Sequence, residues 1–289
     1  MCLTKYYNLN LIQIASLAQV VYYKDTEKIK YYLKNSVFNG HDNIKISNIE
    51  ILSNDDDDAI LMMTDLDIKN QKGLRVFSVR GTSNLKDALL DIEIFAPSIM
   101  LTLIRKFKIG IIETYFSKKL SQYLTYTIRY FKDYTLTYHY ITQLSKLYEK
   151  NINTDRNIIF TGHSLGGGLA KYLGVKYNKQ TISFSGPGVT PLEAEFSKSK
   201  DFNKYIKTYF VDVIPDIDII PRIETTSGTI YRIICEESIM NFAKCHSIDR
   251  TFCMMGIMCD FEEEYTGNIC EGIFSQKELK KMRDAVSGQ

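Results

Sequence analysis

The segment NIIFTGHSLGGGLAKYLGVKYN, Asn157 to Asn178, constrains the fold of this chain more than any other. It starts with strand-forming residues from Ile158 to Thr161 and ends with residues typical of helices. Gly162 and Gly166 each lie two residues from Ser164. This spacing predicts a sharp strand-to-helix turn, in which the serine backbone is strained and a side chain on either glycine would collide with its neighbours. Because such strain is typical of functional sites, Ser164 is the candidate nucleophile.

Composition excludes several classes of protein. The chain has 289 residues, of which 45% are hydrophobic and 24% charged, enough for one large buried core. We find no repeat or low-complexity linker and interpret residues 1–289 as a single domain. The formal charge of +2 gives no general attraction to nucleic acid, so a small or membrane-borne substrate is expected. The most hydrophobic stretch, Ile94 to Ile104, contains Pro97 and is followed by basic residues, so we expect no bilayer span.

The N-terminal residues have two interpretations, a signal peptide or a packed first helix. Polar residues such as Asn10, Gln13 and Gln19 interrupt the apolar run, which weakens the first interpretation. Apolar residues instead recur at helical spacing from Leu11 to Tyr22. We therefore expect a packed helix.

The remaining sequence alternates strand and helix patterns. The expected strands are Ile44–Leu52, Ala59–Asp65, Leu74–Val79, the strand before Ser164, Thr181–Gly188 and Tyr205–Val213. Helical spacing from Tyr134 to Tyr148 precedes the strand before Ser164. Strand, helix, strand is the order that a largely parallel sheet requires, so the fold class is α/β. Four aspartates, Asp55 to Asp58, form a solvated turn tip in this interpretation; a calcium site is the alternative, but no EF-hand spacing follows.

A serine nucleophile needs a histidine base and an acid that orients the base. Of four histidines, His41 and His139 precede the serine, and His163 is expected to pack or to make a local hydrogen bond. His246 is the one histidine after Ser164, which matches the serine, acid, histidine order of α/β-hydrolases.

The acid must lie between Ser164 and His246, just beyond the end of a strand. The segment VDVIPDIDIIPRI offers Asp212, Asp216 and Asp218, and Asp212 falls inside the expected strand. Sequence physics leaves Asp216 and Asp218 open, because both follow Pro215.

An ordered set of motifs between about residues 75 and 250 resembles the class 3 lipases, a family of α/β-hydrolases. The matching segments are VRGTS (Val79–Ser83), GHSLGGGLA around Ser164, SFSGPGV (Ser183–Val189), DIIPRI (Asp218–Ile223) and CHSI (Cys245–Ile248). The resemblance implies Asp218 as the acid, and Thr82 with the backbone N–H of Leu165 as the oxyanion hole. It also implies a helical lid, with Ser83–Asp91 at the family's lid position.

The cysteine-bearing C-terminal segment is similar to that of autophagic, vacuolar and protist lipases. Its five cysteines could form disulfides that hold the His246 loop, remain free thiols or bind zinc: Cys235, Cys245, Cys253, Cys259 and Cys270. The spacings are not paired C-x2-C units, and a zinc ligand role would remove His246 as a base, so we expect no metal. Disulfides would indicate a secretory or vacuolar lumen, and free thiols the cytoplasm.

A helical insertion over about residues 92–130 separates Thr82 from Ser164. Apolar and basic residues alternate in it from Ile94 to Lys119, which is typical of a segment that contacts anionic lipid; packing of two helices with solvated lysines is the alternative. We therefore expect transient contact with a membrane or lipid-droplet surface. The sequence does not indicate the oligomeric state.

Together these residues predict a lipase or esterase that hydrolyses acyl esters of glycerolipids, either triacylglycerol or phospholipid, through an acyl-enzyme. No cofactor is required by this chemistry. Two alternatives remain, a non-catalytic lipase-like module that binds lipid or protein, and a thioesterase or peptidase with the same three residues.

Overall fold

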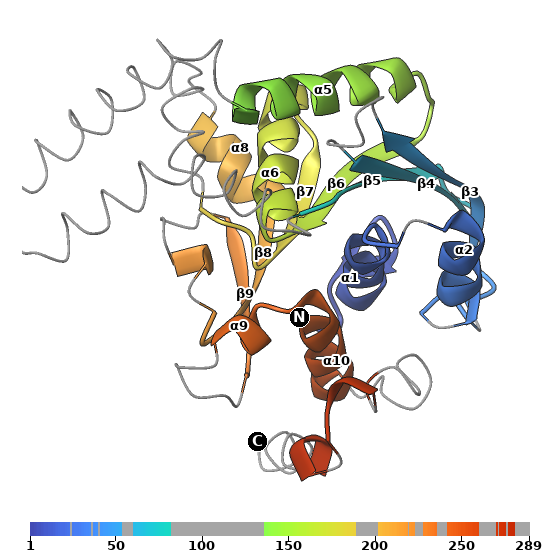
Figure 1. The fold of residues 1–289 in the computed structure, drawn as a ribbon. Helices are drawn as coiled ribbons and strands as arrows, with labels where there is room; N and C mark the ends of the chain where they lie inside the picture. The colour runs from blue at the N-terminus through green and yellow to red at the C-terminus, as the bar shows by residue number, and fades with distance from the viewer. Residues whose placement is uncertain are drawn as a thin grey trace, which may run out of the picture.

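The computed structural model describes residues 1–23, 25–35, 37–39, 41–53, 60–81, 136–188, 202–218, 220–222, 228–235, 242–259, 270, 272–275 and 277–280. Seven strands form one sheet whose spatial order is also their order along the chain (Figure 1). The strands are β3 (Ile44–Ser53), β4 (Ile60–Ile68), β5 (Leu74–Val79), β6 (Asn157–His163), β7 (Gln180–Phe184), β8 (Phe210–Pro215) and β9 (Thr229–Ile233). The pairs from β3 to β5 are antiparallel and those from β5 to β9 are parallel, which confirms the predicted α/β fold.

Helices cover both faces of this sheet (Figure 1). On one face lie α5 (Leu136–Asn151), α6 (Leu165–Tyr177) and α8 (Phe202–Tyr209); on the other lie α1 (Leu11–Val20), α2 (Thr26–Asn35) and α10 (Ile248–Met258). The helix α6 connects the parallel neighbours β6 and β7, and a right-handed connection of this kind places its helix on one face of the sheet. The opposite face is therefore covered by α1 and α10, two helices from distant parts of the chain that pack on each other.

The central strands are buried on both faces, as parallel strands between two helical layers should be. All residues of β6 after Asn157 and all residues of β7 and β8 are buried. Successive side chains of a strand point to opposite faces of the sheet, so adjacent residues pack into different hydrophobic cores. Val76 joins the core under α1 and α10, whereas Phe77 joins Tyr148 and Phe160 under α5 and α6.

The expected N-terminal helix is confirmed as α1, and every one of its residues is buried. Asn10 and Gln13 form a capping box, each side chain accepting a hydrogen bond from the other's backbone N–H. Gln19 donates to Asp249 of α10 and accepts from the Tyr32 hydroxyl. The polar residues that interrupt the apolar run therefore have hydrogen-bond partners within the fold. None of the helices within the described ranges is long and apolar enough to cross a membrane.

The strand predicted over Tyr205–Val213 is wrong in its first half, because α8 continues to Tyr209. Phe202, Tyr205 and Ile206 are buried at helical spacing and form a small core with partners on α6, so packing overrides their preference for strands. The prediction of one domain over residues 1–289 stays a prediction. Its helical insertion at about residues 92–130, the lid at Ser83–Asp91 and the aspartates Asp55–Asp58 lie outside the described residues.

Candidate active site

Ser164 occupies the turn between β6 and α6, where the sequence places it. Its backbone has φ 57° and ψ −131°, a conformation that residues with side chains rarely adopt. The turn is tight on both sides: a side chain on Gly162 would collide with the Gly166 carbonyl, and one on Gly166 would collide with the Val79 carbonyl. Glycine at these two positions lets α6 approach β5 and β6 closely, and Ser164 is held at the carboxyl ends of the parallel strands.

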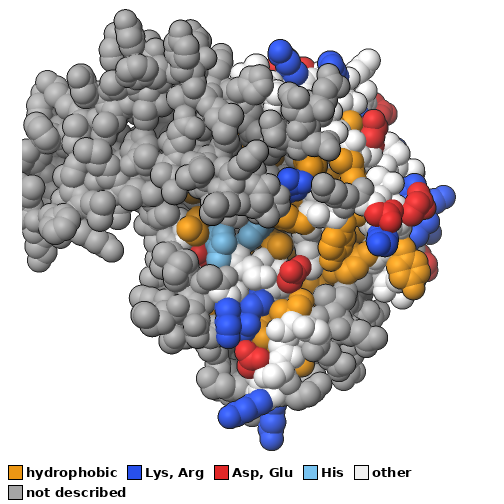
Figure 2. Space-filling model, viewed as in Figure 1, with side chains coloured by type: hydrophobic (Ala, Val, Ile, Leu, Met, Phe, Trp, Pro, Cys, Tyr) orange, Lys and Arg blue, Asp and Glu red, His pale blue; other side chains and the backbone are white. Residues whose placement is uncertain are grey.

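His246 reaches Ser164 from a segment 82 residues further along the chain. It lies between α9 (Phe242–Cys245) and α10, and its Nε2 atom is 2.7 Å from the Ser164 Oγ atom. The imidazole is 21% exposed, so it remains accessible to a substrate. Figure 2 shows histidine side chains at the surface of this face of the molecule, beside hydrophobic side chains.

Asp218 meets the other side of the imidazole. Its Oδ2 atom is 2.9 Å from His246 Nδ1, and its Oδ1 atom accepts a hydrogen bond of 3.0 Å from the Ile220 N–H at the start of η2 (Ile220–Arg222). Because a carboxylate only accepts, Nδ1 carries the proton and Nε2 is left to accept the serine hydroxyl proton. The Asp218 carboxyl is fully buried, so its two partners fix its orientation.

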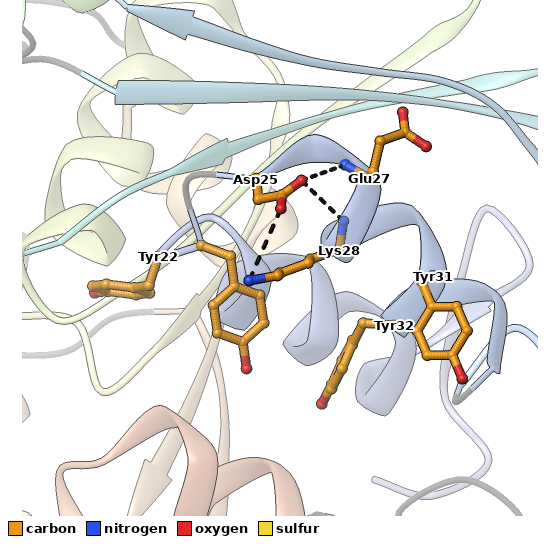
Figure 3. A pocket seen from close by; sticks show the side chains of 7 residues that line it. Tyr22, Asp25, Glu27, Lys28, Tyr31 and Tyr32 are labelled. Carbon is orange, nitrogen blue, oxygen red and sulfur yellow. Dashed lines mark hydrogen bonds and ion pairs between the residues drawn. The ribbon is translucent and has the colours of Figure 1, made fainter.

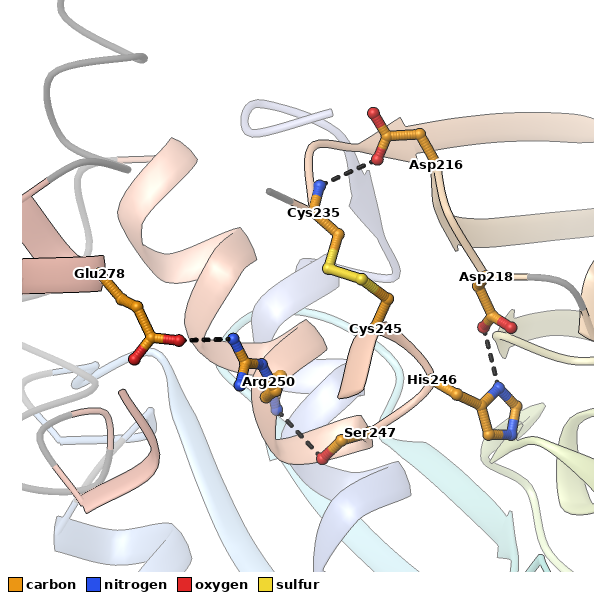
Figure 4. Close-up of a disulfide and its surroundings, with 8 residues drawn as sticks. All are labelled: Asp216, Asp218, Cys235, Cys245, His246, Ser247, Arg250 and Glu278. Atoms are coloured by element: carbon orange, nitrogen blue, oxygen red, sulfur yellow. Dashed lines mark hydrogen bonds and ion pairs between the residues drawn. A yellow bond between two sulfur atoms is a disulfide. The ribbon is translucent and has the colours of Figure 1, made fainter. Parts of the chain in front are cut away.

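The other two aspartates of this segment have different partners. Asp216 points away from His246 and accepts a hydrogen bond of 2.9 Å from the Cys235 N–H (Figure 4). Asp212 lies inside β8, as expected, where it forms an ion pair of 2.7 Å with Lys171 of α6. Burial raises the pKa of the Asp212 carboxyl, against the Lys171 ammonium, which lowers it. Of the three candidates, the structure brings Asp218 to the histidine.

All six cysteines form disulfides, so the zinc and free-thiol alternatives are wrong in this structure. The pairs are Cys2–Cys259, Cys235–Cys245 and Cys253–Cys270. The second pair ends at the residue before His246 and joins the base to the segment held by Asp216 (Figure 4). Sequence reasoning did not consider Cys2, which has no cysteine nearby in the chain. Among the described residues, no group of three or more His, Cys, Asp or Glu side chains could hold a metal ion.

The predicted oxyanion hole is described in part. Leu165 is the first residue of α6 and is buried; an N–H at this end of a helix has no carbonyl partner within the helix. Thr82 lies outside the described residues, and Gly81 is the last described residue before it. The role of both residues stays a prediction.

Tyr22 is a residue near the site that sequence reasoning missed, because only its helical spacing was visible. Its hydroxyl contacts His163, the residue before the candidate nucleophile, at 3.2 Å. Tyr22 also lines an open hollow of about 720 Å³, together with Tyr23, Asp25, Glu27, Lys28, Tyr31 and Tyr32 (Figure 3). His163 is buried, as packing would require, but its ring hydrogen bonds are not local: they join Tyr22 and His246, which are distant in the sequence.

The mostly parallel sheet and the strand–serine–helix turn define an α/β-hydrolase. Residues 76–227 match the sequence profile of Lipase (class 3), which is more than half of the 289 residues. The chain therefore belongs to the class 3 lipase family, and its activity class is that of a lipase or esterase, which hydrolyses carboxylic esters.

Among solved structures, the chain is similar to two fungal proteins. One is a lipase from Rhizopus microsporus var. chinensis, at 14% identity and a TM-score of 0.37, over 78% of this chain and 74% of that chain. The other is a mutant form of MDLA from Penicillium cyclopium, at 12% identity and a TM-score of 0.35, over 78% of each chain. A search of curated proteins gives no match.

Proposed function

We propose that this protein is a serine-dependent lipase that hydrolyses acyl esters of glycerolipids through an acyl-enzyme. The observation that carries the proposal is the series of contacts from Ser164 Oγ to His246 Nε2 at 2.7 Å and from His246 Nδ1 to Asp218 Oδ2 at 2.9 Å. The first distance is one over which a proton can pass from a serine to a positioned base, and the second lets the carboxylate orient that base by a hydrogen bond.

The proposed reaction begins when Ser164 Oγ attacks the ester carbonyl while its proton moves to His246 Nε2. Asp218 keeps the imidazole in the required tautomer and stabilises the imidazolium that forms. The backbone N–H of Leu165 and the predicted donors of Thr82 face the oxyanion. Collapse of the tetrahedral intermediate breaks the ester C–O bond and transfers the His246 proton to the departing alcohol. Water, deprotonated by the same histidine, then attacks the acyl carbon. The bond to Ser164 Oγ breaks, His246 returns the proton to this oxygen, and the fatty acid leaves.

The substrate in this proposal is triacylglycerol or a glycerophospholipid, and the resemblance to lipases supports a glycerolipid over other esters. Contact with a membrane or lipid-droplet surface is part of the proposal, and the segment Ile94–Lys119 that motivates it lies outside the described residues. The three disulfides favour an oxidising compartment, such as a secretory or vacuolar lumen, over the cytoplasm.

Hydrolysis of triolein, phosphatidylcholine, phosphatidylserine and a short p-nitrophenyl ester tests the proposal. Wild type should cleave the short ester and at least one glycerolipid, and Ser164→Ala should cleave none. Ser47→Ala is a matched control, because it also removes one serine hydroxyl, which donates to the Asp65 carbonyl between β3 and β4, away from His246. Equal activity of Ser164→Ala and Ser47→Ala would refute the proposed nucleophile, and hydrolysis of the short ester alone would refute the proposed substrate class.

A further inference from the structure

Three hydrogen bonds connect the end of β5 to the backbone of His246. The Gly81 N–H lies 3.1 Å from the Tyr22 hydroxyl, which lies 3.2 Å from Nδ1 of His163. Nε2 of the same ring lies 2.6 Å from the His246 carbonyl oxygen. These bonds join segments that are far apart in sequence: residue 22 follows α1, residue 81 follows β5, residue 163 ends β6 and residue 246 precedes α10.

The direction of every bond is fixed by the two ends of this series. The Gly81 amide can only donate, so the Tyr22 oxygen accepts from it. The His246 carbonyl can only accept, so Nε2 of His163 carries a proton. A neutral imidazole then has its lone pair at Nδ1, which accepts the Tyr22 hydroxyl proton. With a neutral His163 ring, only one placement of the protons satisfies all three hydrogen bonds.

His163 is suited to remain neutral in this position. Burial, and after it the nearby His246, lower the pKa of His163 from 6.5 to about 3. The two imidazole rings lie 4.9 Å apart between centroids. A neutral His163 does not repel the imidazolium that His246 becomes in the proposed reaction, whereas a second cation at this distance would oppose its formation.

We propose that Tyr22 and His163 are positioning residues that fix the backbone of His246 and thereby the distance from its Nε2 atom to Ser164 Oγ. The proposal rests on the function proposed above, because it concerns the same base. Neither residue touches the reacting atoms: both act through His246 at one end of the series. At the other end, Tyr22 holds Gly81, the residue before the predicted oxyanion residue Thr82. The Tyr22 hydroxyl therefore connects, through His163, the backbone of the base His246 with the end of β5 that precedes the predicted oxyanion residue.

The close packing around Gly81 supports this role. A side chain at Gly81 would collide with the His163 carbonyl and, at 2.5 Å, with the Tyr22 hydroxyl. The Tyr22 hydroxyl therefore lies close to the backbone at Gly81 and to His163, where the space fits a hydrogen-bonded oxygen but no larger group. A phenylalanine ring fills the space of the Tyr22 ring but supplies neither the acceptor for Gly81 nor the donor for His163.

The first test compares Tyr22→Phe with Tyr32→Phe on a soluble short-chain ester. Tyr32→Phe is the matched control, because it also removes one hydroxyl, which donates to Gln19 Oε1 at 2.9 Å and does not contact His246. We expect Tyr22→Phe to lower kcat about tenfold with KM and Tm close to those of the control, since loss of one hydrogen bond displaces the base without closing the site. Equal kcat for the two variants would overturn the proposal, as would a loss that appears in KM or Tm instead of kcat.

A second pair of variants tests His163 itself. His163→Leu should lower kcat by about 100-fold, because the His246 carbonyl loses its donor and the base can shift. His163→Gln places an amide N–H near the position of Nε2 and should recover most of that loss. If His163→Leu and His163→Gln are equally impaired, the hydrogen bond to His246 is not what positions the base.

A spectroscopic measurement does not depend on these variants folding. The ¹⁵N chemical shifts of the His163 ring in the wild-type protein at neutral pH should be those of the Nε2–H tautomer, and a protonated Nδ1 would overturn the proposed direction of the bonds. Ser164→Ala, assayed alongside, separates the two proposals. If it is inactive while Tyr22→Phe matches its control, only the positioning proposal fails; if it is active, the proposed function fails.

Discussion

Acid should weaken the fold through His163, which is buried as a neutral imidazole. Burial lowers its pKa from the ordinary value of 6.5 to about 3. Between these two values the unfolded chain binds a proton at this residue and the folded protein does not. The free energy of unfolding therefore rises with pH in this window: the contribution is fully present above about pH 6.5 and is lost as the pH falls towards 3.

The size of this effect follows from the two pKa values. Each pH unit inside the window changes the free energy of unfolding by somewhat more than about 1 kcal/mol. About 1.5 units of the window lie between pH 7 and pH 5, so His163 alone should account for a loss of about 2 kcal/mol over that interval. For a domain of ordinary stability, this is a large share of the total.

Urea unfolding of wild type and His163→Gln at pH 7, 6 and 5, without reductant so that the disulfides remain, measures the effect. The variant has no imidazole at this position, while all other titrating groups are common to both proteins. Wild type should lose about 2 kcal/mol more than the variant between pH 7 and pH 5. Parallel stability curves for the two proteins would refute the conclusion that His163 is buried in its neutral form.

Three further predictions follow from single contacts. Asp218→Asn should lower kcat by roughly four orders of magnitude, because it removes the carboxylate that orients His246. Asp216→Asn should keep most activity, because the amide oxygen can still accept the Cys235 N–H; the reverse result would assign the acid to Asp216. Lys171→Met should cost about 3–5 kcal/mol of stability, because it leaves a buried carboxylate unpaired, and an unchanged Tm would contradict this. Replacing both Cys235 and Cys245 with serine should lower the free energy of unfolding by about 3 kcal/mol. It should also lower kcat, because the disulfide ends at the residue before His246; an unchanged kcat would show that the disulfide stabilises the fold but does not position the base.

The parts of the fold and site that sequence could predict are those with local patterns. The turn at Ser164 depends on two glycines within two residues of it, and the strand before it is a short apolar run. The order of serine, acid and histidine then restricted the base to His246. The choice of Asp218 over Asp216 needed the family resemblance, because both follow the same strand. The structure distinguishes them by direction, with one facing His246 and the other facing Cys235.

The parts that sequence could not predict are pairings between distant residues. Tyr22 has only helical spacing in the sequence, and its contact with His163 arises because α1 packs against β5 and β6. The partner of Cys2 lies 257 residues away, at the end of α10. The second half of α8, from Tyr205 to Tyr209, has a strand-like sequence because its tyrosines and isoleucine favour strands, and packing against α6 explains its helical conformation.

Trapping the acyl-enzyme tests the central claim most directly. The protein is mixed with a short p-nitrophenyl ester, quenched in acid within the first turnover and analysed by intact-mass and peptide mass spectrometry. A covalent intermediate should add the mass of one acyl group, located on the peptide that contains Ser164, and Ser164→Ala should carry no adduct. Ester hydrolysis without an adduct on Ser164, or with the acyl group on another residue, would contradict the account.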